Sequence, residues 1–174
     1  MSKVRIAAAA LTLSFVGFLG IATHESYTEQ AVIPTKGDRP TYGFGSTVKK
    51  DGTPVRMGDR TDPIRALHVV KAHLDREESA FRESLPDVKL TQGEYDLYMD
   101  FTYQYGIGNW RKQQSPRTWL LRGDYSGACD ALLNWRYAAK YDCSTTINGQ
   151  PNKRCWGVWT RQKQRHATCL AEQQ

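Results

Sequence analysis

The sequence has no cysteine before Cys129, no run of five or six like charges, and no internal repeat or low-complexity linker. A chain without such charge runs is unlike one with a nucleic-acid-binding arm, because such arms concentrate lysines and arginines. His166 and Cys169 are close in sequence, but no Cys-x-x-Cys pair supports a zinc site. The stretch "GFGST" lacks the lysine and following helix of a phosphate-binding loop. We therefore expect no metal, no cofactor and no nucleic-acid partner.

The composition favours one compact domain with a short N-terminal extension. The chain has 174 residues, of which 40% are hydrophobic, and this is enough to bury a single core. Its formal charge of +6 favours an anionic partner. A membrane surface and a polyanionic polymer such as a bacterial wall both fit, and the charge does not choose between them.

The four cysteines lie in the last third of the chain: Cys129, Cys143, Cys155 and Cys169. An even number suggests two disulfides and an oxidising compartment. Cys129 with Cys169 could tie two helices together, and Cys143 with Cys155 could close a loop that contains an "NG" turn. Three pairings exist, and the sequence leaves the choice open.

The N-terminal segment Ile6–Thr23 contains no charged residue and follows two cations, Lys3 and Arg5. This pattern is typical of a targeting signal. Its 18 residues are close to the roughly 20 that span a bilayer, but its alanines and glycines make insertion weak. Cleavage after the small-x-small sequence Gly20-Ile21-Ala22 is the alternative prediction.

Hydrophobic patterning predicts an α+β fold with a small β-hairpin lobe, a larger helical lobe and an N-terminal apolar helix. Two or three short strands are expected within Pro40–Arg60, around an Asp51-Gly52 turn. An amphipathic helix is expected over residues 61–85, with Ile64, Leu67, Val70, Leu74, Phe81 and Leu85 facing inward. "TQGE" at Thr91–Glu94 matches a capping box, and that helix should end at Gly106. Shorter helices are expected over 115–123 and 125–135, a loop over 138–155 and a basic helix over 156–170.

Two carboxylates and a hydroxyl form the candidate catalytic group. Cleavage of a glycosidic bond by acid catalysis needs a protonated carboxyl group for the leaving oxygen and a second group that orients water. Glu25 suits the first role, because desolvation at an apolar helix end favours the protonated form of a carboxyl group. Asp38 and Thr41 suit the second.

The order of these residues resembles that of a known family. "ESYTEQAVIPTKGDRPTYGFGST", from Glu25 to Thr47, is similar to the catalytic stretch of bacteriophage-type lysozymes, glycoside hydrolase family 24, in which Glu, a spacer and Asp precede "TxGxGxT". "LTQGEYDLYMDFTYQYGIG" resembles the segment that closes the cleft, and "LRGDYSGACDALLNW" and "WTRQKQRHATCL" resemble later helices. The sequence departs from the pattern in two places. Asp38 lies three residues before Thr41 instead of six, and Ser46 stands where the family often has histidine.

The resemblance implies a lysozyme-like catalytic domain over residues 24–174, behind a targeting segment over residues 1–23. It implies cleavage of the β-1,4 bond between N-acetylmuramic acid and N-acetylglucosamine in peptidoglycan, by a monomeric endolysin in phage-induced host lysis. The implied residues are Glu25, Asp38 and Thr41 for catalysis and Tyr42, Gln104 and Gly106 for substrate binding. A lytic transglycosylase-like reaction that uses Glu25 alone and a non-catalytic wall-binding module are the alternatives. Trp110, Trp119 and Trp135 are candidate sugar-stacking residues or, alternatively, buried core residues.

The apolar segment has a second implied role. In the resembling lysozymes a helix precedes the catalytic Glu, and in this chain the residues available for it belong to Ile6–Thr23. We therefore expect an uncleaved signal-anchor-release segment. It would tether the enzyme to the periplasmic face of the host inner membrane and later release it into the periplasm.

Overall fold

The computed structural model describes residues 3–24, 27–34 and 37–174, and the side chain of residue 24 is not described. The chain divides into two compact units. The sheet unit comprises the described residues of 14–79, and the helical unit comprises the described residues up to 13 together with 80–174. The first part of the apolar segment, up to residue 13, belongs to the helical unit.

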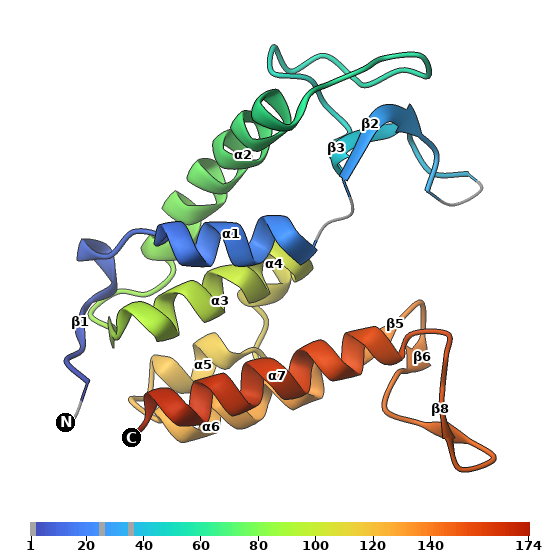
Figure 1. Cartoon of the computed structure of the whole chain (residues 1–174). Coiled ribbons are helices and arrows are strands. Elements are labelled where there is room, and N and C mark those ends of the chain that lie inside the picture. The colour runs from blue at the N-terminus through green and yellow to red at the C-terminus, as the bar shows by residue number, and fades with distance from the viewer. Residues whose placement is uncertain (1–2, 25–26, 35–36) are drawn as a thin grey trace. The chain divides into compact units, whose positions relative to one another are not determined.

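The apolar segment does not form one continuous helix. It contains a strand, β1 (Ile6–Ala7), a 3-10 turn, η1 (Ala8–Ala10), and a ten-residue helix, α1 (Phe15–His24), as Figure 1 shows. The first part pairs with another strand instead of extending α1, and the Ala8 amide donates to the Val88 carbonyl. Ser14 Oγ accepts from the Gly17 amide and so starts α1 at that point. In the described part of the chain, no helix combines the length and apolarity needed to cross a membrane.

The sheet unit contains two antiparallel strands, β2 (Tyr27–Val32) and β3 (Thr41–Phe44). The register pairs Tyr27 with Phe44 and Val32 with Thr41. The sequence predicts two or three short strands within Pro40–Arg60; β3 lies there, whereas β2 lies earlier in the chain and was not predicted. Around the predicted Asp51-Gly52 turn, Val48 and Pro54 form an isolated bridge in place of a full hairpin.

Helix α2 (Pro63–Glu83) approaches β3 closely at Gly43. A Cβ atom on Gly43 would lie 2.7 Å from the Ala66 Cβ, and the Gly43 φ angle is 60°, so this position requires glycine. The Asp62 carboxylate accepts from the Arg65 amide at 2.9 Å and caps the start of α2. Ile64 is 69% exposed, so its predicted inward position was wrong; on this first turn Ala66 is the buried residue.

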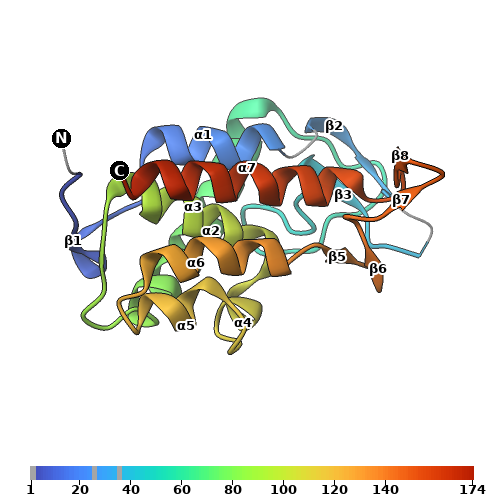
Figure 2. The same ribbon diagram turned by 90° about the horizontal axis from the view of Figure 1, so that it is seen from below.

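The helical unit is built around α3 and α7 (Figure 2). Its elements are β4 (Lys89–Leu90), α3 (Gln92–Tyr105), α4 (Ile107–Trp110), α5 (Pro116–Leu120), α6 (Tyr125–Ala131), η2 (Leu132–Asn134) and α7 (Trp156–Glu172). The predicted capping box is confirmed, because Thr91 and Glu94 exchange both side-chain-to-backbone hydrogen bonds. Aromatic rings fill the core, with Trp110 in contact with Phe81, Tyr98 and Phe101.

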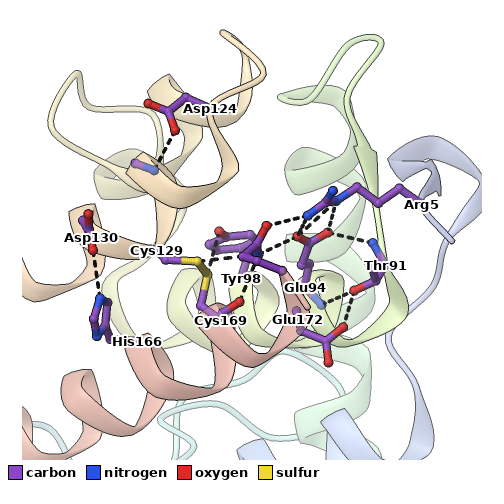
Figure 3. Close-up of a disulfide and its surroundings, with 12 residues drawn as sticks. Arg5, Thr91, Glu94, Tyr98, Asp124, Cys129, Asp130, His166, Cys169 and Glu172 are labelled. Atoms are coloured by element: carbon purple, nitrogen blue, oxygen red, sulfur yellow. Dashed lines mark hydrogen bonds and ion pairs between the residues drawn. A yellow bond between two sulfur atoms is a disulfide. The ribbon is translucent and has the colours of Figure 1, made fainter. Parts of the chain in front are cut away.

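Two disulfides close the last third of the chain. Cys129–Cys169 ties α6 to α7 (Figure 3), and Cys143–Cys155 closes the segment before α7. The predicted loop over 138–155 in fact contains two short hairpins, which sequence patterning had missed. These are β5 (Tyr137–Ala138) with β6 (Tyr141–Asp142), and β7 (Thr146–Ile147) with β8 (Gln150–Pro151). Each turns through two residues of positive φ, Ala139-Lys140 and Asn148-Gly149, which matches the twist of a tight hairpin.

The N-terminal residues are attached to the helical unit by an ion pair between Arg5 and the buried carboxylate of Glu94 (Figure 3). Arg5 Nη2 lies 2.6 Å from Glu94 Oε1, and Arg5 Nε lies 2.9 Å from Glu94 Oε2. The Glu94 side chain has no exposed surface, and its hydrogen bonds raise the pKa of Arg5. The antiparallel pairing of β1 with β4 continues the attachment, with Ile6 opposite Leu90. The start of the apolar segment is therefore part of the folded helical unit.

Candidate active site

The candidate catalytic residues Asp38 and Thr41 lie near one another in the chain, where the connection from β2 enters β3. Asp38 is exposed, and its carboxylate makes no hydrogen bond or ion pair with the described residues. Thr41 is the half-buried first residue of β3 and pairs with Val32. Glu25 lies outside the described residues, directly after the end of α1. The Asp38 carboxylate is thus available to water and substrate, while Thr41 is held by the sheet.

The backbone around "TYGFGST" is supported without a histidine. Ser46 donates its amide to the Tyr42 carbonyl at 3.0 Å, and the Tyr42 amide returns a hydrogen bond at 3.1 Å. The Ser46 hydroxyl donates to the Val48 carbonyl at 2.7 Å. Serine at this position therefore stabilises the turn that follows β3.

Tyr42 lies in the core of the sheet unit, where it packs with Ala31 and Val55. Burial raises the pKa of its phenol, which stays protonated at neutral pH. The packing gives the ring a role in the core. Contact between Tyr42 and substrate stays a prediction.

Gln104, on the last turn of α3, is oriented by a buried cation. Its Oε1 accepts from Arg165 Nη1 at 2.5 Å, and Arg165 Nε donates to Asp100 Oδ2 at 2.7 Å. Burial lowers the pKa of Arg165, and the adjacent Asp100 carboxylate opposes that shift. Because Oε1 is engaged, the amide NH₂ of Gln104 is the end of the side chain with no acceptor among the described residues. The arrangement suits a donor to a sugar hydroxyl or an acetamido oxygen.

Gly106 forms the turn between α3 and α4. Its φ angle is 81°, which an L side chain rarely adopts. Its amide donates to the Thr102 carbonyl at 2.7 Å, and its own carbonyl accepts from the Trp110 amide at 3.1 Å. The glycine therefore ends α3 directly after Gln104 and Tyr105.

A cavity of about 300 Å³ lies within the helical unit next to this turn. Three aromatic and three amide side chains line it: Tyr105, Asn109, Gln114, Asn134, Trp135 and Tyr137. The buried Trp135 Nε1 is a donor without a partner among the described residues. The Tyr105 hydroxyl donates to the Trp135 carbonyl at 2.7 Å and holds that residue in place. Aromatic faces combined with amides suit a polar ring such as a sugar.

The three tryptophans proposed from the sequence have different environments. Trp110 is fully buried and donates Nε1–H to Ser84 Oγ at 2.8 Å, so it is a core residue. Trp119 is 36% exposed and lies beneath the Arg122 guanidinium. Of the three, Trp135 is the one that lines the cavity.

Sequence reasoning missed most of the cavity-lining residues. Asn134 and Tyr137 flank Trp135 in the segment "NWRY", whereas Asn109 and Gln114 come from α4 and the turn that follows it. The proximity of "NWRY" to a candidate stacking residue was an available signal. No periodicity signal points to Asn109 or Gln114, because only the tertiary fold brings them to the cavity beside Asn134 and Trp135.

Comparison with known proteins places this arrangement in a family. The model of the family described as phage lysozyme matches residues 22–156. The endolysin of Salmonella phage P22 is 32% identical over 101 residues, covering 58% of this chain and 68% of the relative. A crystal structure of a P22 lysozyme mutant shares the fold with a TM-score of 0.71 and 24% identity, covering 92% of this chain and 99% of the other. The structure of the endolysin from Escherichia coli O157:H7 phage FAHEc1 also shares the fold, with a TM-score of 0.74 and 23% identity. The alignment covers 92% of this chain and 94% of the other.

These matches confirm the resemblance that the motifs indicated and the lysozyme-like fold. The family match extends from the end of α1 to the start of α7 and includes Glu25, Asp38, Thr41 and Gln104. Membership implies hydrolysis of peptidoglycan. The chain belongs to the phage lysozyme family and is a muramidase, a glycoside hydrolase.

Proposed function

We propose that the chain hydrolyses the β-1,4 bond between N-acetylmuramic acid and N-acetylglucosamine, with Glu25 as the general acid. The family match over residues 22–156 carries this proposal, because it spans each residue of the catalytic motif. The basic charge of the chain favours approach to the anionic wall.

The proposed reaction is an inverting hydrolysis. Glu25 donates its proton to the leaving glycosidic oxygen, and water attacks the anomeric carbon from the opposite face of the sugar. Asp38 accepts the proton of that water, and the Thr41 hydroxyl orients it. The exposed Asp38 carboxylate supports this role, since it makes no hydrogen bond that would tie it to the described protein.

One observation favours a second candidate reaction. Asp38 lies three residues before Thr41, whereas the family pattern places its aspartate six residues before. If Asp38 does not reach the water, Glu25 alone would cleave the same bond through attack by the sugar's own hydroxyl group. That reaction yields an anhydro end, as in lytic transglycosylases.

Mass analysis of the released muropeptides separates these reactions and tests the proposed function. Purified peptidoglycan digested to completion should yield reducing N-acetylmuramic acid ends, each one water heavier than the anhydro form. Anhydro ends would establish the second reaction, and the absence of released muropeptides would contradict both. Digestion of the same peptidoglycan by a known muramidase provides the positive control.

The cavity beside Trp135 is the proposed sugar-binding site of the helical unit. Replacing Gln114 and Asn134 by alanine should raise KM for soluble glycan fragments by about tenfold and change kcat little, because these amides bind without touching the reacting atoms. Steady-state kinetics measures both constants. Gln113→Ala is the matched control, since Gln113 is the exposed neighbour of Gln114 and does not line the cavity. An unchanged KM in the double variant would remove the cavity from the binding site.

We also propose that the chain acts as a signal-anchor-release endolysin during phage-induced lysis, first at the host inner membrane and then in the periplasm. The charge-free Ile6–Thr23 and the two cations before it support the tethered state. The Arg5–Glu94 pair and the pairing of β1 with β4 support a released state in which the segment is folded. A mature N-terminus at Thr23 on the periplasmic protein would contradict the proposal.

A further inference from the structure

The excess positive charge of the chain is concentrated in one stretch. Residues 135–165 contain seven cations and a single carboxylate, so their formal charge of +6 equals that of the whole chain. Two of the cations, Arg161 and Arg165, pair with Asp100, and Arg136 pairs with Asp142. The other four, Lys140, Lys153, Arg154 and Lys163, are exposed and have no acidic partner among the described residues. Three of these four lie on the hairpin segment before α7, and Lys163 lies in the first half of α7, so the segment carries a net positive surface.

Aromatic rings lie beneath two of these cations. The Arg154 guanidinium lies 3.6 Å from the centroid of Tyr141, and Lys163 Nζ lies 5.3 Å from Trp156 and 5.7 Å from Trp159. Each of these cations lies over an aromatic face, where the ring attracts it electrostatically. The combination of rings and cations continues from β6 into α7.

The same region exposes apolar side chains at its tip. Ile147 is 60% exposed next to the Asn148-Gly149 turn, and Tyr141 is 42% exposed on the other hairpin. Figures 1 and 2 both show the β7–β8 hairpin extending beyond the N-terminal end of α7. The Cys143–Cys155 disulfide closes the base of this hairpin. A tight turn thus presents an isoleucine outward on a covalently closed support.

We propose that this hairpin surface, formed by Lys140, Tyr141, Ile147, Lys153, Arg154 and Lys163, binds the surface of an anionic phospholipid bilayer. Four cations without acidic partners match the negative headgroups, and each basic residue near such a surface strengthens binding. Tyr and Trp rings occupy the headgroup level, and a protruding isoleucine can enter the acyl boundary. A glycan strand carries carboxylates but offers no apolar layer for Ile147. This surface is separate in sequence from Ile6–Thr23, and the proposal does not depend on the catalytic assignment.

Vesicle co-sedimentation of the full, oxidised chain tests this surface. The vesicles contain phosphatidylglycerol and phosphatidylcholine in equal amounts, or phosphatidylcholine alone. The variant Lys140→Gln/Lys153→Gln/Arg154→Gln should bind the anionic vesicles about a hundredfold more weakly than the native chain, since each basic residue contributes a factor of about five. The matched control, Lys50→Gln/Arg56→Gln/Arg76→Gln, removes the same charge from exposed residues elsewhere and should bind much more strongly than the first variant.

A second variant tests the apolar tip without changing the charge. Ile147→Ser should weaken binding to anionic vesicles by about tenfold, because it removes most of a buried aliphatic side chain. Equal binding of the two triple variants would overturn the proposal, as would binding to phosphatidylcholine that matches binding to the anionic vesicles. Retention on purified peptidoglycan sacculi that depends on the three hairpin cations, without binding to anionic vesicles, would also overturn it and identify the wall as the partner.

Discussion

Glu25→Gln is expected to abolish lysis of peptidoglycan, with a loss of at least about a thousandfold in the rate of clearing. Glutamine keeps the size and hydrogen-bonding ends of the side chain but carries no transferable proton, so the leaving sugar oxygen would depart as an unprotonated alkoxide. Clearing of a peptidoglycan-containing gel and the fall in turbidity of a sacculus suspension measure the loss. Activity within tenfold of the native chain would remove Glu25 from the catalytic role.

Glu29→Gln is the matched control for this variant. Glu29 is an exposed residue of β2, four positions after Glu25 in the sequence. It forms a surface ion pair with Arg60 at 2.8 Å. Exposed pairs of this kind contribute little to stability, so Glu29→Gln should retain close to native activity. In the same assay Asp38→Asn should lose about a hundredfold, because a neutral amide cannot accept the proton of the attacking water. Native activity in Asp38→Asn would favour the reaction that uses Glu25 alone.

Arg5→Ala is expected to lower the free energy of unfolding by about 3 kcal/mol, because it leaves the fully buried Glu94 carboxylate without its cation. The carboxylate would keep hydrogen bonds from the Thr91 amide at 2.8 Å and from Gln173 Nε2 at 2.9 Å, but no positive charge. Urea titration followed by circular dichroism measures the change. The effect should appear although Arg5 precedes the domain that the sequence alone predicts.

Lys3→Ala gives the matched comparison for the N-terminal attachment. Lys3 pairs with Glu172 at 2.7 Å, but its side chain is 45% exposed, so its removal should cost less than about 1 kcal/mol. The double variant Arg5→Ala/Glu94→Gln should be less destabilised than the sum of its single variants, because it removes the buried carboxylate together with its cation. Equal losses in Arg5→Ala and Lys3→Ala would contradict the buried-pair explanation.

Attachment of the N-terminal residues to the helical unit has a structural consequence for the folded protein. The Arg5–Glu94 pair uses the same carboxylate that completes the capping box at the start of α3. The segment therefore binds at a place where the helical unit already holds a buried negative charge. A cation at residue 5 satisfies that charge, which gives the arginine at this position a role in the folded protein besides any role in targeting.

Local signals in the sequence were sufficient to predict several structural features. The capping box at Thr91 and Glu94, the glycine that ends α3 and the proline that begins α2 act within one turn of helix, so short motifs predicted them. The stretch from Glu25 to Thr47 was sufficient to indicate the family, because its residue order is specific. The even number of cysteines indicated two disulfides, and the structure selected one of the three pairings.

Long-range contacts decided the rest. Pairing of β1 with β4 joins residues more than eighty positions apart, and it divides an apolar segment that composition alone describes as one helix. The different roles of Trp110 and Trp135 depend on which rings and amides the helices bring around them. The sequence by itself determined which chemical groups this protein has and how they are spaced along the chain, because a motif depends only on residue types and short-range spacing. Tertiary structure alone decided which side chains are buried, paired or open to a ligand, because burial depends on neighbours distant in the chain.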